Sequence, residues 1–186
     1  MAELKLFMLL LGCKPPGRHT EQHDIFFAIA GSLNELVPAI RSFWPEPERI
    51  HIDAWREVTA VDDFRVTVHE GPAGNKQSPG RLFFINLGGY QPNKFEEQHY
   101  PVLTVKPDRA AAFREAKETL FFKHNHFEDA NAHIDDKYGI DVDDLYEIEE
   151  ILSPRQKNSY HIRLTPQTGL PGDEVHLGYL KLSELE

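Results

Sequence analysis

The sequence predicts an α+β fold built from a duplicated β-β-α-β-β unit, with mostly antiparallel sheets that are each covered by one helix. Three observations support this prediction: two stretches of the chain resemble each other, each contains two apolar β-type runs, and a helical pattern follows each pair of runs. The 186 residues are 40% hydrophobic and 27% charged, as is usual for a globular protein.

The repeat is clearest when residues 6–23 are aligned with residues 82–99 at an offset of 76. Eight of the eighteen positions are identical, including a glycine and a contiguous Glu-Gln-His. A His-Ile-Asp motif at 51–53 also matches 133–135 at an offset of 82. These matches predict two copies of one unit, with about six residues inserted before the second His-Ile-Asp.

The first unit shows the order of elements most clearly. Apolar runs predict strands over residues 6–11 and 24–30, and a helix follows from Ser32, a favourable N-cap residue. Glu35 lies three residues further on, as in a capping box, and Pro38 predicts a kink or a late helix start. Further strands are expected over residues 50–58 and 64–69.

The second unit is expected to repeat this order. Its predicted elements are strands over 82–87 and 100–105, a helix over 109–123 after Asp108, and strands over 132–134 and 145–151. A tail follows, in which residues 160–165 and 174–182 flank a Gly/Pro turn and predict a hairpin that covers an edge strand.

The segment between the copies, residues 71–80, is rich in Gly and Pro and is typical of a linker. The predicted boundaries are therefore 1–70 for unit one, 81–152 for unit two and 153–186 for the C-terminal hairpin extension. A unit of this size is only marginally stable alone, so we expect two pseudo-twofold halves packed into one compact body.

Composition excludes several classes of protein. The formal net charge of −10 disfavours binding to nucleic acid and to anionic membranes, and no apolar run reaches the 18 or so residues of a membrane span. The apolar run at 6–11 has an internal counterpart, so we interpret it as a strand and not as a signal peptide. A single cysteine, Cys13, indicates a reducing compartment, and we expect a cytoplasmic protein.

Gly12 and Gly88 each follow the first apolar run of a unit. Their spacing fits neither Gly-x-Gly-x-x-Gly nor a P-loop, so no cofactor-binding motif is assigned to them. We interpret them as turn positions that need a positive φ, and Cys13 as a partly buried thiol.

These motifs in their order resemble those of the domain of unknown function 1543 (DUF1543) family. The resemblance rests on the Leu-Gly-x-x-x-Pro, Glu-Gln-His and His-Ile-Asp motifs of both halves and covers nearly the whole chain. It implies a bacterial protein with two tandem copies of the domain. It implies no activity, cofactor or catalytic residue.

The repeated motifs single out four of the ten histidines. Each lies two residues from a carboxylate, and residues two apart on a strand point to the same face. If the strands approach each other, each unit gathers two imidazoles and two carboxylates. The candidates are Glu21, His23, His51 and Asp53 in the first unit and Glu97, His99, His133 and Asp135 in the second.

Several interpretations of these residues stay open. Imidazole and carboxylate are ligands of Zn, Mn and Fe, and they also form His–carboxylate pairs for proton transfer. The structural alternative is that each histidine bridges strand ends by a hydrogen bond to a carboxylate or a backbone carbonyl. Binding of a small ligand or an anion is a further alternative, because the motifs are short and not specific to one chemistry.

A second candidate feature is acidic. Residues 128–150 contain ten acidic residues and one lysine. The aspartates suggest a hard divalent cation, although the spacing does not match an EF-hand loop; the alternatives are a solvated acidic face and a surface that steers a basic partner protein. The residues concerned, besides Asp135, are Asp136, Asp141, Asp143 and Asp144.

The absence of a nucleophile or cofactor motif favours a non-catalytic binding or interaction module. The alternative is a metal-dependent, hydrolase-like enzyme that uses the repeated Glu-Gln-His and His-Ile-Asp motifs. The only cofactor that these motifs suggest is a divalent metal. A protein partner or a homodimer fits this prediction, whereas nucleic acid and membranes do not.

Overall fold

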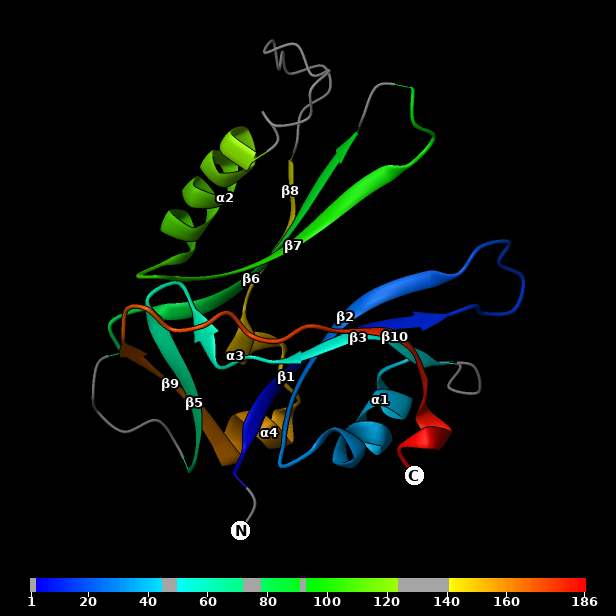
Figure 1. The fold of residues 1–186 in the computed structure, drawn as a ribbon, viewed down its shortest axis with the longest axis horizontal. Coiled ribbons are helices and arrows are strands. Elements are labelled where there is room, and N and C mark those ends of the chain that lie inside the picture. The colour runs from blue at the N-terminus through cyan, green and yellow to red at the C-terminus, as the bar shows by residue number, and fades with distance from the viewer. Residues whose placement is uncertain (1–2, 45–49, 72–77, 91–92, 124–140) are drawn as a thin grey trace. The chain divides into compact units, whose positions relative to one another are not determined.

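The computed structural model describes residues 3–44, 50–71, 78–90, 93–123 and 141–186 (Figure 1). Two compact units form: unit 1 consists of Met1–Gln77 and Leu152–Glu186, and unit 2 of Ser78–Ile151. The predicted α+β class with antiparallel sheets is confirmed. In the described part of the chain, no helix has both the length and the hydropathy needed to cross a membrane.

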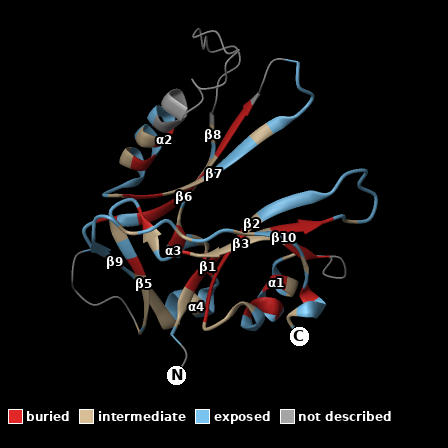
Figure 2. Cartoon of the chain, in the orientation of Figure 1, coloured by how far each residue is buried: buried red, intermediate tan, exposed pale blue. Residues whose placement is uncertain are grey.

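The main sheet of unit 1 has four antiparallel strands in the order β10-β3-β1-β2. Strand β1 is central and buried along most of its length (Figure 2), because side chains on its odd-numbered face enter a hydrophobic core. The strands are β1 (Lys5–Cys13), β2 (Gln22–Ala30), β3 (His51–Glu57) and β10 (His176–Lys181).

A short helical segment covers the core face of this sheet. The 3-10 helix η1 (Leu33–Leu36) precedes α1 (Val37–Phe43), and Pro38 lies in the first turn of α1, so the predicted late start is confirmed. The predicted capping box is not formed: the Ser32 side chain caps no backbone N–H, and Glu35 accepts a hydrogen bond from the Gly31 N–H at 3.1 Å.

Unit 1 contains a second, three-stranded sheet in the order β4-β5-β9. Its strands are β4 (Ala60–Val61), β5 (Phe64–Glu70) and β9 (Tyr160–Pro166). Helix α4 (Pro154–Ser159) precedes β9, and the 3-10 helix η5 (Leu182–Glu184) follows β10.

The predicted C-terminal hairpin is wrong, although both of its strands exist. Strand β9 pairs with β5 and β10 pairs with β3, so the two strands do not pair with each other. The segment between β9 and β10 is instead held at residues 59–60. There the Asp173 carboxylate accepts hydrogen bonds from the Thr59 N–H and hydroxyl and from the Ala60 N–H. The prediction that the tail covers an edge strand is confirmed, since β10 pairs with β3.

Unit 2 has a three-stranded antiparallel sheet in the order β7-β6-β8. Helix α2 contributes Ala112 and Ala116 to a core with Phe83, Ile85 and Leu87, and Asp108 caps the helix by accepting from the Ala111 N–H. The elements are β6 (Arg81–Tyr90), β7 (Glu97–Lys106), α2 (Arg109–Lys123), β8 (Asp141–Glu147) and α3 (Ile148–Ile151).

The third strand of unit 2 differs from the prediction. A strand over 145–151 is wrong, because β8 ends at Glu147 and residues 148–151 are helical. The strand predicted over 132–134 lies outside the described residues. Strand β8 pairs with β6 as β3 pairs with β1, with Asp141 opposite Gly88 as His51 is opposite Gly12. By pairing, residues 141–143 therefore correspond to residues 51–53.

Candidate functional site

The candidate site of unit 1 is built around Gly12 in the central strand. Gly12 pairs with His23 on β2 and with His51 on β3, so the two histidines flank a position without a side chain. A Cβ at this position would lie 2.5 Å from Asp53 Oδ2 and would overlap the His51 ring. The expected positive φ is wrong, since Gly12 and Gly88 lie within strands and are not among the glycines with positive φ.

A β-bulge in β3 directs the Asp53 side chain into this site. Along β1, Leu10 pairs with Ala54 and Leu11 with Ile52, so Asp53 is the extra residue. A bulge changes the direction of a side chain relative to the regular alternation of a strand. The carboxylate of Asp53 consequently lies over Gly12 and beside both histidines.

The four predicted residues of unit 1 form one cluster, which we call the His/carboxylate cluster. His51 Nε2 lies 3.1 Å from Glu21 Oε1 and 3.3 Å from Asp53 Oδ1. His23 Nε2 lies 3.2 Å from Asp53 Oδ2 and 3.8 Å from Glu21 Oε2. Each carboxylate therefore places one oxygen beside each imidazole, and the cluster forms a closed ring.

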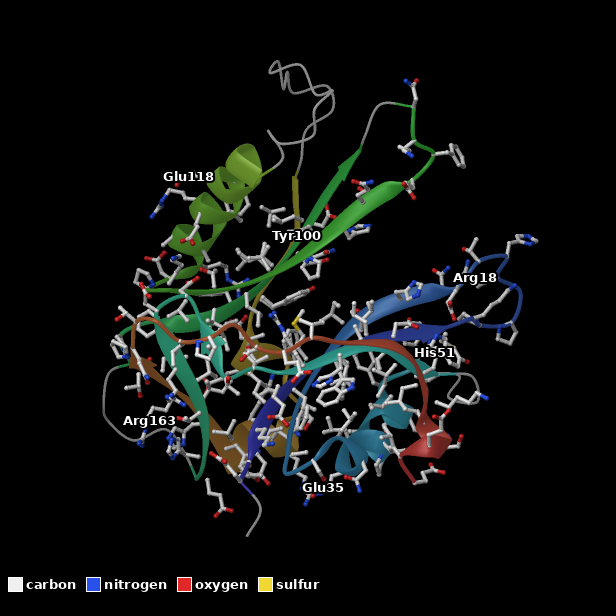
Figure 3. The ribbon with its side chains drawn as sticks, viewed as in Figure 1. Arg18, Glu35, His51, Tyr100, Glu118 and Arg163 are labelled. Carbon is white, nitrogen blue, oxygen red and sulfur yellow. The ribbon has the colours of Figure 1, made fainter. Side chains whose placement is uncertain are left out.

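The members of the cluster differ in burial. The His51 side chain, labelled in Figure 3, is only 4% exposed. Its ring lies against that of Tyr179, with the ring centroids 4.1 Å apart. Glu21 and His23 are exposed, and Asp53 is partly buried. One side of the cluster is therefore fixed by packing and the other is open to solvent.

The burial of one Asp53 oxygen in the cluster is not matched by a hydrogen bond. Asp53 Oδ2 is buried and accepts no hydrogen bond from the described residues, although it lies 3.2 Å from His23 Nε2. The two observations agree if the contact is close but poorly directed for an N–H···O bond. A buried carboxylate oxygen of this kind favours a cation beside it.

Unit 2 repeats much of this arrangement. His99 pairs with Gly88, and His99 Nδ1 lies 3.2 Å from Asp143 Oδ2. Asp143 is again the extra residue of a bulge, and a Cβ at Gly88 would overlap its carboxylate. Glu97 Oε2 lies 3.9 Å from His99 Nε2, which repeats the relation of Glu21 to His23.

Two further polar side chains neighbour the cluster of unit 2. The Asn86 amide nitrogen lies 3.3 Å from His99 Nδ1 and 3.4 Å from Asp144 Oδ2, and Tyr146 donates to Asp144 Oδ1 at 3.2 Å. His99 Nδ1 can accept from the amide or donate to Asp143, according to the tautomer. Unit 1 has no counterpart of these contacts at this position, because Leu10, which corresponds to Asn86 by strand pairing, has an apolar side chain.

The structure brings together most of the predicted candidates. His133, Asp135 and Asp136 lie outside the described residues, and only the backbone of Asp141 is described. Asp143, predicted only as a member of the acidic segment 128–150 and not of the repeated motifs, takes the position of Asp53. Tyr179 was missed, because nothing in its sequence context links the C-terminal tail to His51.

The cluster has the donor types of a metal site without its finished geometry. Within the described ranges, no group of three or more His, Cys, Asp and Glu side chains is arranged to hold a metal ion. In this arrangement an imidazole and a carboxylate can share a proton, because the Nε2 atom of each imidazole faces oxygens of both carboxylates.

Comparison with known proteins supports the family resemblance over part of the chain. Residues 18–68 match the family model described as Domain of Unknown Function (DUF1543), and this stretch contains the whole cluster of unit 1. No curated protein matches the chain.

A solved structure shares the fold. The crystal structure of a protein Il1583 from Idiomarina loihiensis is similar over 97% of this chain and 98% of its own length, with a TM-score of 0.64 and 20% sequence identity. This likeness supports the α+β architecture across both units.

Proposed function

We propose that the protein is a non-catalytic binding module and that the His/carboxylate cluster of unit 1 binds a divalent metal ion. One observation carries the proposal: two imidazole nitrogens and two carboxylates converge over a glycine, and one buried carboxylate oxygen among them has no hydrogen bond. A cation is the partner that this oxygen and the neighbouring imidazoles favour.

The separations in the cluster fit a small ion. Zinc ligands lie about 2.0–2.1 Å from the metal in a tetrahedron, which places donor atoms roughly 3.3 Å apart. The four nitrogen–oxygen distances of the cluster are 3.1, 3.2, 3.3 and 3.8 Å. Binding requires one oxygen of each carboxylate to turn toward a common point. Glu21 has the freedom to do so, since it precedes β2 and is exposed.

The test is metal analysis of protein purified without a chelator or a His-tag and then equilibrated with zinc. We expect near-stoichiometric metal in the wild type and loss of it in His23→Ala and in His51→Ala. His19→Ala is the matched control, because this histidine is exposed and makes no contact in the cluster. Wild type that retains no zinc after equilibration contradicts the proposal.

Stability measurements separate binding from a purely structural role. Removing the buried His51 leaves carboxylate oxygens without a partner, so we expect a loss of roughly 1–3 kcal/mol, whereas exposed His23 should matter less. A structural bridge predicts this stability loss without any bound metal. A binding site predicts in addition that zinc raises the melting temperature of the wild type and not of His23→Ala.

A metal-dependent, hydrolase-like enzyme is the second candidate. Catalytic zinc sites keep one position open for water, and the exposure of Glu21 and His23 leaves such a position on one side of the cluster. Hydrolysis of simple esters or phosphoesters by zinc-loaded protein, lost in His23→Ala, would favour it. Zinc binding without hydrolysis favours the binding module.

We further propose that unit 2 is a second copy of the family domain. The same strand order, the glycine, the bulge and the Glu-x-His motif occur in both units. Asp141 stands at the backbone position of His51, so the second copy offers more oxygen and less nitrogen. We expect it to favour Mg²⁺ or Mn²⁺ over zinc. The single cysteine, Cys13, leads us to propose a cytoplasmic protein.

A further inference from the structure

We propose that the polar face of sheet β4-β5-β9 binds a tetrahedral oxyanion of the phosphate class. This face, which we call the basic face, is separate from the His/carboxylate cluster. Three cross-strand pairs form it: Arg65 with Thr165, Thr67 with Arg163, and His69 with His161. Every pair contains a side chain that is or can become cationic.

The basic face follows from strand alternation. Val66 and Leu164 are buried on the opposite face, so alternate residues of β5 and β9 place Arg65, Thr67, His69 and their partners on one side. All residues of the three strands are described, and their one acidic residue, Glu70, alternates to the side of Val66. A chain with a net charge of −10 thus has a local surface of the opposite sign.

The two histidines are close enough to act on one ligand. Their ring centroids are 5.5 Å apart, with the planes 24° from parallel. His161 Nδ1 lies 2.9 Å from the Gly71 carbonyl oxygen, which can only accept, so Nδ1 carries the proton. Protonation of His161 therefore adds a donor at Nε2. His69 Nε2 lies 3.0 Å from the Thr67 hydroxyl.

Charge on this face is not balanced. Burial lowers the pKa of His69, and repulsion from Arg163 and from His161 lowers it further. Strand β4 packs against β5 with Ala60 and Val61 and offers no charged group to offset this repulsion. An anion bound over β5 and β9 would offset the repulsion on His69. Guanidinium, imidazolium and hydroxyl donors on two strands suit an oxyanion with several acceptor oxygens.

Linkage between anion binding and protonation gives the test. An anion that binds the protonated face more tightly must raise the pKa of His69. We would titrate the histidine ring signals by NMR from pH 8 to 5 in about 20 mM sodium sulfate and in sodium chloride of equal ionic strength, so that screening is the same. Sulfate is the probe because its charge does not change over this range.

We expect sulfate to raise the pKa of His69 by roughly half a unit more than chloride does, which corresponds to about threefold tighter binding to the protonated state. Arg163→Gln should abolish the difference and, in chloride alone, should raise the pKa of His69, because one repulsive charge is gone. Arg18→Gln is the matched control. Arg18 lies in the loop between β1 and β2, away from this face (Figure 3).

Equal shifts in sulfate and chloride in the wild type overturn the proposal, as does a sulfate effect that survives Arg163→Gln. The comparison of the two salts in the wild type decides the question even if Arg163→Gln does not fold. Because His69, His161 and Arg163 take no part in the His/carboxylate cluster, the result is independent of metal binding there.

Discussion

Gly12 makes room for the His/carboxylate cluster. Its neighbours across the sheet are His23 and His51, and the space that a Cβ would occupy is filled by the ends of the His51 and Asp53 side chains. The His51 ring packs against Tyr179, which restricts its rotation away from the strand. Glycine is therefore needed here for space above the strand and not for an unusual backbone angle.

Gly12→Ala should displace His51 and Asp53 and lower the free energy of unfolding by about 1–3 kcal/mol, as overpacking usually does. The control is Gly172→Ala, because a Cβ there would meet nothing within 4 Å and the residue does not have a positive φ. We expect the control to change stability by less than about 0.5 kcal/mol. Urea denaturation measures both, and equal midpoints for the two variants would be inconsistent with a crowded Gly12.

At the scale of elements, each bulge converts an ordinary third strand into part of a site. Asp53 and Asp143 are the extra residues of β3 and β8, and both carboxylates lie over a glycine of the central strand. Each of the two strands also forms an ion pair with the first residue of the central strand of its own unit. Lys5 pairs with Glu57 at 2.7 Å, and Arg81 pairs with Glu147 at 2.8 Å.

The paired strands of each unit and helix α2 could be predicted from the sequence, because their apolar periodicity and the constant offset of the repeat are visible within short stretches of the chain. The sequence did not predict β8, because matching identical letters favoured residues 133–135, whereas the strand needs only a carboxylate at the bulge. The repeat of Asp53 and Glu57 by Asp143 and Glu147, at a common offset of 90, could have located this strand. Strand partners such as β9 with β5 depend on long-range packing that local patterns do not record.

Strand β10 closes the edge of β3 and should be needed for the stability of the main sheet. It pairs with β3 on both sides of Asp53, and His176 stacks on Trp55 with the ring centroids 4.0 Å apart. Leu182, which follows β10, is buried in the core. Truncation after Asp173 should therefore expose an unpaired edge and promote aggregation. Leu182→Ala, which keeps the strand, should lose about 2–5 kcal/mol in urea denaturation.

The matched control for Leu182→Ala is Leu177→Ala, which lies in β10 itself. Leu177 is 81% exposed, so its truncation should have little effect on the free energy of unfolding. A truncated chain that stays monomeric in light scattering and melts at the wild-type temperature would contradict the role given to β10.

At the scale of the molecule, unit 1 is assembled from both ends of the chain. Residues before the second unit supply β1 to β5, and residues after it supply β9 and β10. The two segments meet where Glu70 pairs with Tyr160 and the Gly71 N–H donates to the Ser159 carbonyl at 2.8 Å. Unit 2 is thus an insertion between adjacent positions of unit 1, and its removal need not break the pairing of β5 with β9.

We therefore expect a protein in which residues 1–71 are joined to residues 152–186 by a flexible Gly/Ser linker of about eight residues to fold better than residues 1–71 alone. Residues 1–71 lack β10, which pairs with β3, and β9, which pairs with β5. They also lack the buried Leu152 and Leu182, so they should be poorly soluble. Circular dichroism and the dispersion of amide NMR signals compare the two. If the shorter fragment is soluble and melts as cooperatively as the joined one, the C-terminal strands complete unit 1 without stabilising it, and the insertion argument fails.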